Sequence, residues 1–421
     1  MRRLLILLIL ATFSLSGFAS RILIPMDLSQ SNHLKAYGIA YWVLNQDVTI
    51  DWMLNFRGGS FLLPSSASIE KELVIRGVSY EVISDATAAQ YETQIASPSS
   101  NMDMMKLEKV PKIAVYSPKT KMPWDDAVTL ALTYAEIPYD IIYDDELMAD
   151  EMTKYDWLHL HHEDFTGQYG KFYATYSPYS WYQQQQKDYE ASARKHGFTK
   201  VSQLKLAIAQ KIRTFVAGGG FLFAMCSATD SFDIALAANG LDFIEAMYDG
   251  DPANPAAESQ FDFSQTLAFE DFKLKNDPLE YEFSDIDNTD ARRSRALTEG
   301  NDFFKLFEFS AKWDPIPTML TQNHTRLIKG FYGQTTAFKT RVIKPDVVTM
   351  GQNDAAEEAK YIHGVFGNGF WTFYGGHDPE DYQHRVGEEP TDLNLYPNSP
   401  GYRLILNNIL FPAAKKKKRK T

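Results

Sequence analysis

The most reactive side chain in the sequence is its single cysteine, Cys226. It follows the apolar run Phe221 to Ala224, and small residues lie two positions to either side of it in Ala224-Met225-Cys226-Ser227-Ala228. A nucleophile on a sharp strand-to-helix turn requires such neighbours, because bulky side chains would collide in the turn. The amides and dipole of a helix beginning near Ser227 to Ser231 would favour the thiolate. We predict that Cys226 is a nucleophile; the alternative is a small buried core residue.

A second reactive group lies late in the chain, in Phe373-Tyr374-Gly375-Gly376-His377-Asp378-Pro379-Glu380. An aromatic strand ends there, two glycines open space, and a histidine follows with carboxylates beside it. A cysteine nucleophile needs a base, and the base needs an acceptor that orients it. We therefore predict that His377 is the base and that Glu380 or Asp378 is the orienting acid. The alternative is a histidine in a polar turn.

Strand-like and helix-like segments alternate around these residues. Strands are predicted at Ile113 to Tyr116, Tyr139 to Tyr143, Trp157 to His161 and Phe221 to Ala224, helices at Asp125 to Ala135 and Leu204 to Val216, and a late hairpin at Tyr361 to Tyr374. Long insertions are expected near 165–200 and 249–300. This order predicts an α/β fold with a mainly parallel sheet covered by helices on both faces.

The segment before this region is predicted to form a separate N-terminal α/β unit over residues 20–98. Its pattern suggests strands at Ile22 to Pro25, Thr49 to Leu54 and Tyr80 to Ile83, with helices at His33 to Leu44 and Glu70 to Ile75. Such a βαβαβ order favours a mainly parallel sheet. Residues Ala96 to Lys112 lack a sustained period and are expected to be a linker.

Residues from about Pro111 to Pro412 resemble the class I glutamine amidotransferase-like superfamily, especially its ThuA-like and DJ-1/PfpI-like branches. The matching features are the small-x-Cys-x-small pattern around Cys226 and the helix-Gly-Gly-strand segment before it. The resemblance implies a flavodoxin-like domain over 111–412, with the cysteine elbow after a central strand. Glutaminases of this superfamily carry His-Pro-Glu; here His377-Asp378-Pro379-Glu380 is one residue longer, which displaces the acid and argues against glutaminase activity.

Similar exported bacterial sequences are sometimes labelled asparagine synthetase B, but the residues do not support that chemistry. The enzyme requires an N-terminal nucleophilic cysteine and a Ser-Gly-Gly-x-Asp-Ser loop for ATP. The expected mature start, Ser20-Arg21, has no cysteine, and Arg57-Gly58-Gly59-Ser60 is not that loop.

The resemblance to the glutamine amidotransferase-like superfamily also suggests a role for the polar residues that follow the strand at Trp157. Ligands of open α/β sheets bind at the carboxyl ends of strands, so His161, His162 and Glu163 are expected beside Cys226 in a pocket where the Ser227 amide stabilises an oxyanion. Imidazoles and a carboxylate suit zinc, but alternation along a strand would send His161 and His162 to opposite faces. We therefore expect no metal site and no cofactor. The alternative is that these residues cap the strand.

The first residues of the chain predict export, and the last ones form a basic tail. Arg2 and Arg3 precede an apolar run, Leu4 to Phe13, and Gly17-Phe18-Ala19 resembles a cleavage site, so residues 1–19 are a predicted signal peptide and the bacterial periplasm is the expected location. The tail at 413–421 carries six positive charges from Lys415 to Lys420, which would touch an anionic surface or an envelope protein, or simply remain solvated.

Composition limits the possible functions further. The 421 residues are 44% hydrophobic and 14% aromatic, which is typical of folded domains. The formal net charge of -12 argues against nucleic acid as a partner.

Two functions remain open at this point. The first is an exported Cys-His hydrolase of an amide or ester-like bond. The second is a non-catalytic protein of the envelope that binds a small molecule or glycan in the same crevice. The aromatic residues of the insertion, Tyr173, Tyr176, Tyr179, Trp181 and Tyr182, would either stack on a sugar or pack against one another.

Overall fold

The structure, a computed structural model, describes residues 20–118, 126–290, 297–383, 385 and 387–415. The predicted signal segment and the tail beyond Lys415 therefore lie outside the described residues. Lys415 itself pairs with Glu108 at 3.1 Å. Within the described ranges, no helix has both the length and the apolar character needed to cross a bilayer.

The N-terminal unit is built on a five-stranded sheet in the order β4-β1-β3-β2-β5, and every adjacent pair is antiparallel. Its strands are β1 (Ser20–Ile24), β2 (Ile50–Leu54), β3 (Ser60–Pro64), β4 (Glu81–Ser84) and β5 (Asp103–Leu107). Helices α2 (His33–Leu44) and α3 (Ala67–Ile75) share a core with one face of the sheet, and α4 (Asp85–Ala96) shares a core with the other. The α/β composition agrees with the prediction.

The predicted parallel arrangement of this unit is wrong. The turn at Arg57-Gly58-Gly59, where Gly58 and Gly59 have φ of +77° and +90°, folds β3 back onto β2 as a hairpin. The sequence pattern did not resolve β3, which then pairs with β1. The expected linker is also partly wrong, because β5 lies inside it and pairs with β2, so the N-terminal unit continues to Leu107.

The second sheet has ten strands and is partly parallel. Its order is β11-β10-β13-β14-β15-β9-β8-β6-β7, and β12 pairs with β14. The parallel strands are β6 (Ile113–Tyr116), β7 (Asp140–Ile142), β8 (Trp157–Leu160), β9 (Phe221–Met225) and β15 (Gly369–Tyr374). The antiparallel strands are β10 (Phe303–Leu306), β11 (Leu327–Lys329), β12 (Phe338–Lys339), β13 (Val348–Asn353) and β14 (Glu358–Phe366). The molecule is thus a mixed α/β structure.

The predicted late hairpin is confirmed. Strands β14 and β15 are antiparallel, and Phe366 pairs with Gly369 across the two-residue turn Gly367-Asn368. Gly367 has φ of +60°, a conformation that favours glycine in such turns. Because β15 then runs parallel to β9, the hairpin brings the end of β15 beside the end of β9.

Helices cover both faces of the ten-stranded sheet. Helices α5 (Ala127–Ala135) and α14 (Pro400–Leu410) belong to the hydrophobic core that also includes α2, whereas α9 (Val201–Gly218) and α10 (Ser227–Ala238) belong to the core on the other side. The short helices α6 (Asp144–Met148), α11 (Ala246–Asp249) and α13 (Pro315–Leu320) lie in connections, and α7 (Tyr173–Tyr176) and α8 (Ser180–Lys195) form the first insertion.

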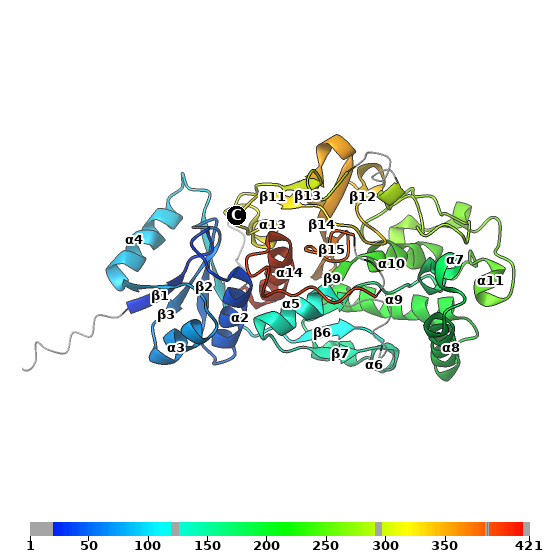
Figure 1. Ribbon diagram of the computed structural model, residues 1–421, viewed down its shortest axis with the longest axis horizontal. Helices are drawn as coiled ribbons and strands as arrows, with labels where there is room; N and C mark the ends of the chain where they lie inside the picture. The colour runs from blue at the N-terminus through cyan, green and yellow to red at the C-terminus, as the bar shows by residue number, and fades with distance from the viewer. Residues whose placement is uncertain (1–19, 119–125, 291–296, 384, 386, 416–421) are drawn as a thin grey trace, which may run out of the picture.

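The N-terminal unit docks on this second domain through α2. Figure 1 shows the N-terminal unit at one end of the molecule and α7, α8 and α11 at the other, with α14 and α5 beside α2. The contact is close, because a Cβ added at Gly38 of α2 would lie 1.8 Å from the carbonyl oxygen of Ala135. The two units therefore share one continuous core.

Candidate active site

Cys226 lies on a strained turn between a strand and a helix. Strand β9 ends at Met225, α10 begins at Ser227, and Cys226 between them has φ of 53° and ψ of -141°. A residue with a side chain rarely adopts this conformation, which costs on the order of 1–3 kcal/mol. The strand-turn-helix arrangement predicted from the small neighbours of Cys226 is confirmed.

Backbone amides surround the sulfur. The amide of Gln334 donates to Sγ at 3.3 Å, and the amides of Thr335 and Ser227 also act on it. Burial nevertheless raises the pKa of the Cys226 thiol to about 11, because these hydrogen bonds only partly offset the loss of water. The thiol is therefore protonated at neutral pH, and a thiolate forms there only if another group accepts the proton.

The loop that supplies Gln334 packs directly on the segment that carries His377. The amide of His377 donates to the carbonyl of Tyr332 at 2.9 Å, and the amide of Gly376 donates to Thr335 at 2.7 Å. A Cβ added at Gly333 would lie 2.8 Å from the backbone of Gly376 and His377, so only glycine permits this approach. The loop thereby contacts both the Cys226 sulfur and the segment that carries His377.

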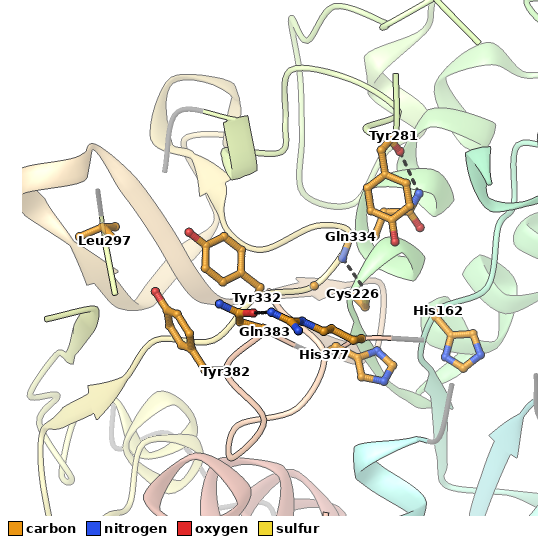
Figure 2. A pocket seen from close by; sticks show the side chains of 11 residues that line it. His162, Cys226, Tyr281, Leu297, Tyr332, Gln334, His377, Tyr382 and Gln383 are labelled. Carbon is orange, nitrogen blue, oxygen red and sulfur yellow. Dashed lines mark hydrogen bonds between the residues drawn. The ribbon is translucent and has the colours of Figure 1, made fainter. Parts of the chain in front are cut away.

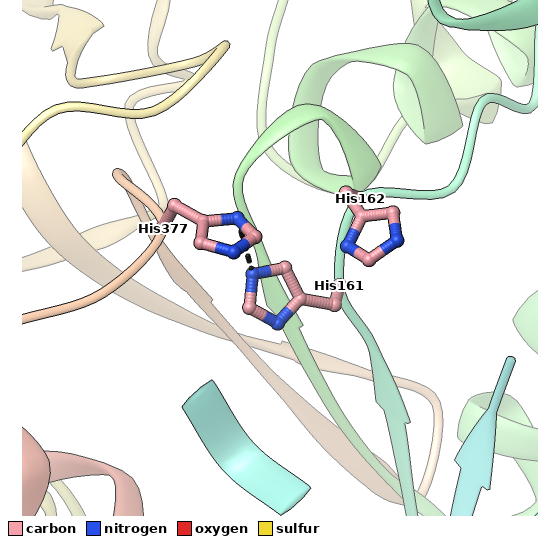
Figure 3. Close-up of side chains that lie close together, drawn as sticks. All are labelled: His161, His162 and His377. Atoms are coloured by element: carbon pink, nitrogen blue, oxygen red, sulfur yellow. Dashed lines mark hydrogen bonds between the residues drawn. The ribbon is translucent and has the colours of Figure 1, made fainter. Parts of the chain in front are cut away.

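His377 faces a second histidine, which faces an aspartate. Nδ1 of His377 lies 2.8 Å from Nε2 of His161 (Figure 3). Nδ1 of His161 lies 3.2 Å from Oδ1 of Asp126. His161 and His377 are buried, with 2% and 1% of the residue surface exposed, respectively. Asp126, His161 and His377 thus form a chain of three titratable groups, which runs from the start of α5 to the cavity that Cys226 also lines.

Asp126 has several partners besides His161. It caps α5 by accepting from the amides of Val128 and Thr129, and its Oδ2 lies 3.3 Å from Nε2 of His159. Burial alone would raise the pKa of Asp126, but the adjacent imidazoles of His159 and His161 hold it well below its ordinary value. Asp126 is therefore ionised at neutral pH and can fix the proton positions on His161.

The two carboxylates predicted to orient His377 have other partners. Oδ2 of Asp378 accepts from the hydroxyl of Tyr402 at 2.7 Å, and Oδ1 accepts from the amide of Glu380 at 2.9 Å. The Glu380 carboxylate interacts with Ser399, and burial raises its pKa. The carboxylate that the structure connects to His377, through His161, is Asp126.

His161 and His162 do not point to opposite faces as strand alternation predicted. Strand β8 ends at Leu160, so the two histidines lie beyond the strand and its two-residue period no longer applies. One nitrogen from each of His161, His162 and His377 lies within 4.8 Å of the others. The expected separation, on which the argument against a metal rested, is therefore wrong.

Glu163 lies in a different environment from Cys226. It lines a small second pocket together with His162, Asp164 and Tyr189. Burial raises the pKa of Glu163 to about 8. The predicted pocket residues therefore lie in different places. The Ser227 amide faces the sulfur, and His161 lies against His377. His162 lines both pockets, whereas Glu163 lines only the second.

Cys226 and His377 open into one cavity of about 400 Å³ (Figure 2). Aromatic and hydrogen-bonding side chains dominate its wall. The lining residues are His162, Cys226, Tyr281, Leu297, Tyr332, Gly333, Gln334, His377, Tyr382, Gln383 and Arg385. A polar ligand of modest size fits such a wall.

Both insertions reach this cavity through Gln334. Its side-chain amide donates to the carbonyl of Gly170 at 2.6 Å and to that of Tyr281 at 2.9 Å. The aromatic residues of the first insertion mostly contact one another: the rings of Tyr176 and Trp181 are 5.3 Å apart. Their arrangement agrees with packing within the insertion.

Sequence reasoning missed Asp126 and Gln334. Asp126 carried a usable signal, because an aspartate before an apolar helix is a typical N-cap and the helix starts at the carboxyl end of β6. Gln334 carried none, since both its backbone amide and its side chain act from an irregular loop through contacts distant in the sequence.

Comparison with known proteins gives little similarity. No family model matches the chain, and no curated protein matches it. Two structures from Salmonella typhimurium align with this chain over 100% of their own length. Cytoplasmic protein STM3548 has 10% sequence identity, covers 73% of this chain and has a TM-score of 0.34. Cytoplasmic protein STM1381 has 12% sequence identity, covers 72% of this chain and has a TM-score of 0.34. A GH42 β-galactosidase, Gan42B, aligns over 64% of this chain and 28% of its own length, with 10% sequence identity and a TM-score of 0.28.

Proposed function

We propose that this protein is a cysteine-dependent hydrolase of an amide or ester-like bond, with a flavodoxin-like catalytic domain. Numbered along the chain, the five parallel strands β6, β7, β8, β9 and β15 have the spatial order 2-1-3-4-5, which is the order of flavodoxin-like sheets. The cysteine turn follows the fourth of these strands. This order supports the proposed relation to the glutamine amidotransferase-like superfamily.

The observation that carries the proposal is the Asp126–His161–His377 chain beside the strained cysteine. The negative charge of Asp126 favours a proton on Nδ1 of His161. Nε2 of His161 is then an acceptor, so the short contact requires that Nδ1 of His377 donates to it. In this tautomer Nε2 of His377 is unprotonated and able to act as a base.

The reaction then proceeds by acyl transfer to the sulfur. Nε2 of His377 takes the thiol proton as Sγ of Cys226 bonds to the substrate carbonyl carbon, and the carbonyl oxygen becomes an oxyanion beside the Ser227 amide. The same proton passes from His377 to the leaving group when the bond to carbon breaks. Water, deprotonated by His377, then attacks the thioester and restores the thiol.

The test is a hydrolysis screen with p-nitrophenyl esters and p-nitroanilides, followed by intact-mass detection of an acyl-enzyme. We expect turnover by the full chain and an added acyl mass that disappears in Cys226→Ala. His196→Ala is the matched control, because His196 pairs with Asp145 and lines neither pocket, so turnover should be unchanged. Equal turnover by Cys226→Ala would contradict the proposal.

A second function is favoured by one observation, the raised pKa of the buried thiol. In this alternative the protein is a non-catalytic binder of a small polar molecule or glycan, held by Tyr281, Tyr332 and Tyr382 in the cavity. A glycan array probed with the wild-type protein and with Tyr332→Ala tests it. Binding that requires Tyr332, together with an inert thiol, would favour the binder over the hydrolase.

The proposed setting is the bacterial cell envelope, based on the signal-like residues 1–19 and the basic tail Lys415 to Lys420. Fractionation of cells expressing the full chain tests this directly. A processed chain in the periplasm is expected, and a full-length chain in the cytoplasm would contradict it.

A further inference from the structure

Three histidines, of which His162 and His377 line the cavity and His161 lies behind them, form a group that goes beyond the proposed thiol chemistry. His161 and His162 follow β8, and His377 follows β15, so the carboxyl ends of the two strands that flank β9 supply them (Figure 3). Their ring centroids lie 4.1 Å (His161–His377), 5.1 Å (His161–His162) and 5.7 Å (His162–His377) apart. We propose that His161, His162 and His377 bind one divalent transition metal ion, with Zn²⁺ as the probe ion.

The donor set fits this class of metal. Three imidazoles are a known ligand set for catalytic zinc, in which water or substrate takes the fourth position. Zinc–nitrogen bonds of about 2.0–2.1 Å place tetrahedral ligands roughly 3.4 Å apart. One nitrogen of each histidine already lies within 4.8 Å of the others, and one pair is 2.8 Å apart, so loading requires only small ring movements.

The surroundings of His161 match those of a metal-bound imidazole. Its Nε2 faces Nδ1 of His377 at 2.8 Å, and its Nδ1 lies 3.2 Å from Oδ1 of Asp126. A carboxylate on the outer nitrogen fixes the tautomer of a ligating histidine and increases its basicity. Asp126 therefore acts as a positioning residue for the metal ligand.

An ion can reach the three histidines from the cavity, and its fourth ligand position would face that cavity. His162 is only partly buried, and both His162 and His377 line the 400 Å³ cavity. The Cys226 sulfur lies outside the three-nitrogen group. The fourth ligand would thus be water or a polar ligand from the cavity rather than the thiol.

A competing group lies close by, and the experiment must distinguish the two. Asp126, His159 and His161 also present one ligand atom each within 4.8 Å. His159 is fully buried, and its ring stacks between Trp157 and Phe223. That group has no member lining the cavity among the described residues, so we assign the metal to the three histidines.

The experiment measures Zn²⁺ binding by the full chain, purified without a polyhistidine tag and dialysed against a chelator. A chromogenic chelator competes for the metal, and circular dichroism verifies that each variant is folded. We expect one Zn²⁺ per chain. His162→Ala, at the most exposed of the three positions, should abolish competition, and Asp126→Asn should weaken affinity on the order of 10–100-fold. Cys226→Ala and the surface variant His196→Ala should bind as the wild type does.

Cobalt supplies an independent readout. Co²⁺ bound by three imidazoles and water should give four-coordinate visible bands without a sulfur-to-metal charge-transfer band. No stoichiometric Zn²⁺ binding would overturn the proposal, as would binding that survives His162→Ala but is lost in His159→Ala. A bound metal would occupy His377, so turnover by Cys226 is measured on the chelator-treated, metal-free chain, where failure of the hydrolase is distinguished from failure of metal binding.

Discussion

The strain at Cys226 predicts that an alanine-to-glycine change lowers the free energy of unfolding less at this position than at an unstrained strand position. We compare Cys226→Ala with Cys226→Gly, and use Ala224→Gly in the adjacent strand as the reference site. Changing alanine to glycine in a buried strand lowers the free energy of unfolding in two ways. The lost burial of a methyl group costs about 0.8 kcal/mol, and the greater backbone entropy of the unfolded chain costs about 0.5–1 kcal/mol. At Ala224, which is fully buried in β9, the expected cost is therefore roughly 1.3–1.8 kcal/mol.

At position 226 the same change also relieves strain. The φ of 53° and ψ of -141° are accessible to glycine, so about 1–3 kcal/mol is recovered. The alanine-to-glycine change at 226 should therefore range from a cost of about 0.8 kcal/mol to a gain of about 1.7 kcal/mol. Equilibrium urea unfolding, followed by circular dichroism, compares the free energies of unfolding. If glycine costs as much at 226 as at 224, the turn is not strained and the argument for a nucleophile position fails.

Three further predictions concern buried ionisable groups. Lys205 is a buried cation that pairs with Asp144 at 3.0 Å, so Lys205→Met should lower the free energy of unfolding by about 3–5 kcal/mol, whereas Lys211→Met in the same helix should change it little; equal effects in urea unfolding would contradict this. Burial lowers the pKa of His324 to about 3 from 6.5, so the unfolded chain binds more protons below pH 6.5 and stability should fall as the pH drops; His324→Gln should flatten that fall, and an unchanged slope would refute the reasoning. Burial raises the pKa of Glu163 to about 8 from 4.5, so the native state binds more protons in that window and stability should decrease as the pH rises through it; thermal unfolding of Glu163→Gln should lack this decrease, and a parallel curve would count against the assignment.

Local patterns predicted the cysteine turn well. The apolar strand, the small residues around Cys226 and the start of the helix that follows are all encoded within a few positions: β9 begins at Phe221 as expected and ends one residue later, and α10 begins within the expected range. The late hairpin was predictable for the same reason, since its glycine turn lies between two apolar strands.

Features that depend on long-range pairing were not predictable in this way. The order of strands and helices in the N-terminal unit suggested a parallel sheet, but the pairing of β3 with β1 is set by tertiary packing. The orienting carboxylate was expected beside His377 in the sequence, whereas Asp126 reaches it from α5 through His161. Strand alternation failed for His162 because β8 ends two residues earlier.

The measurement that tests the central claim most directly is the rate of Cys226 alkylation by iodoacetamide as a function of pH, in the wild type and in His377→Ala. Burial raises the pKa of the isolated thiol to about 11, so reaction near pH 7 requires that His377 accept the proton. We expect the folded wild type to react near neutral pH, and His377→Ala to react only as the pH approaches about 11. If both proteins remain unreactive near neutral pH until they are denatured, Cys226 is a core residue and the hydrolase account is wrong.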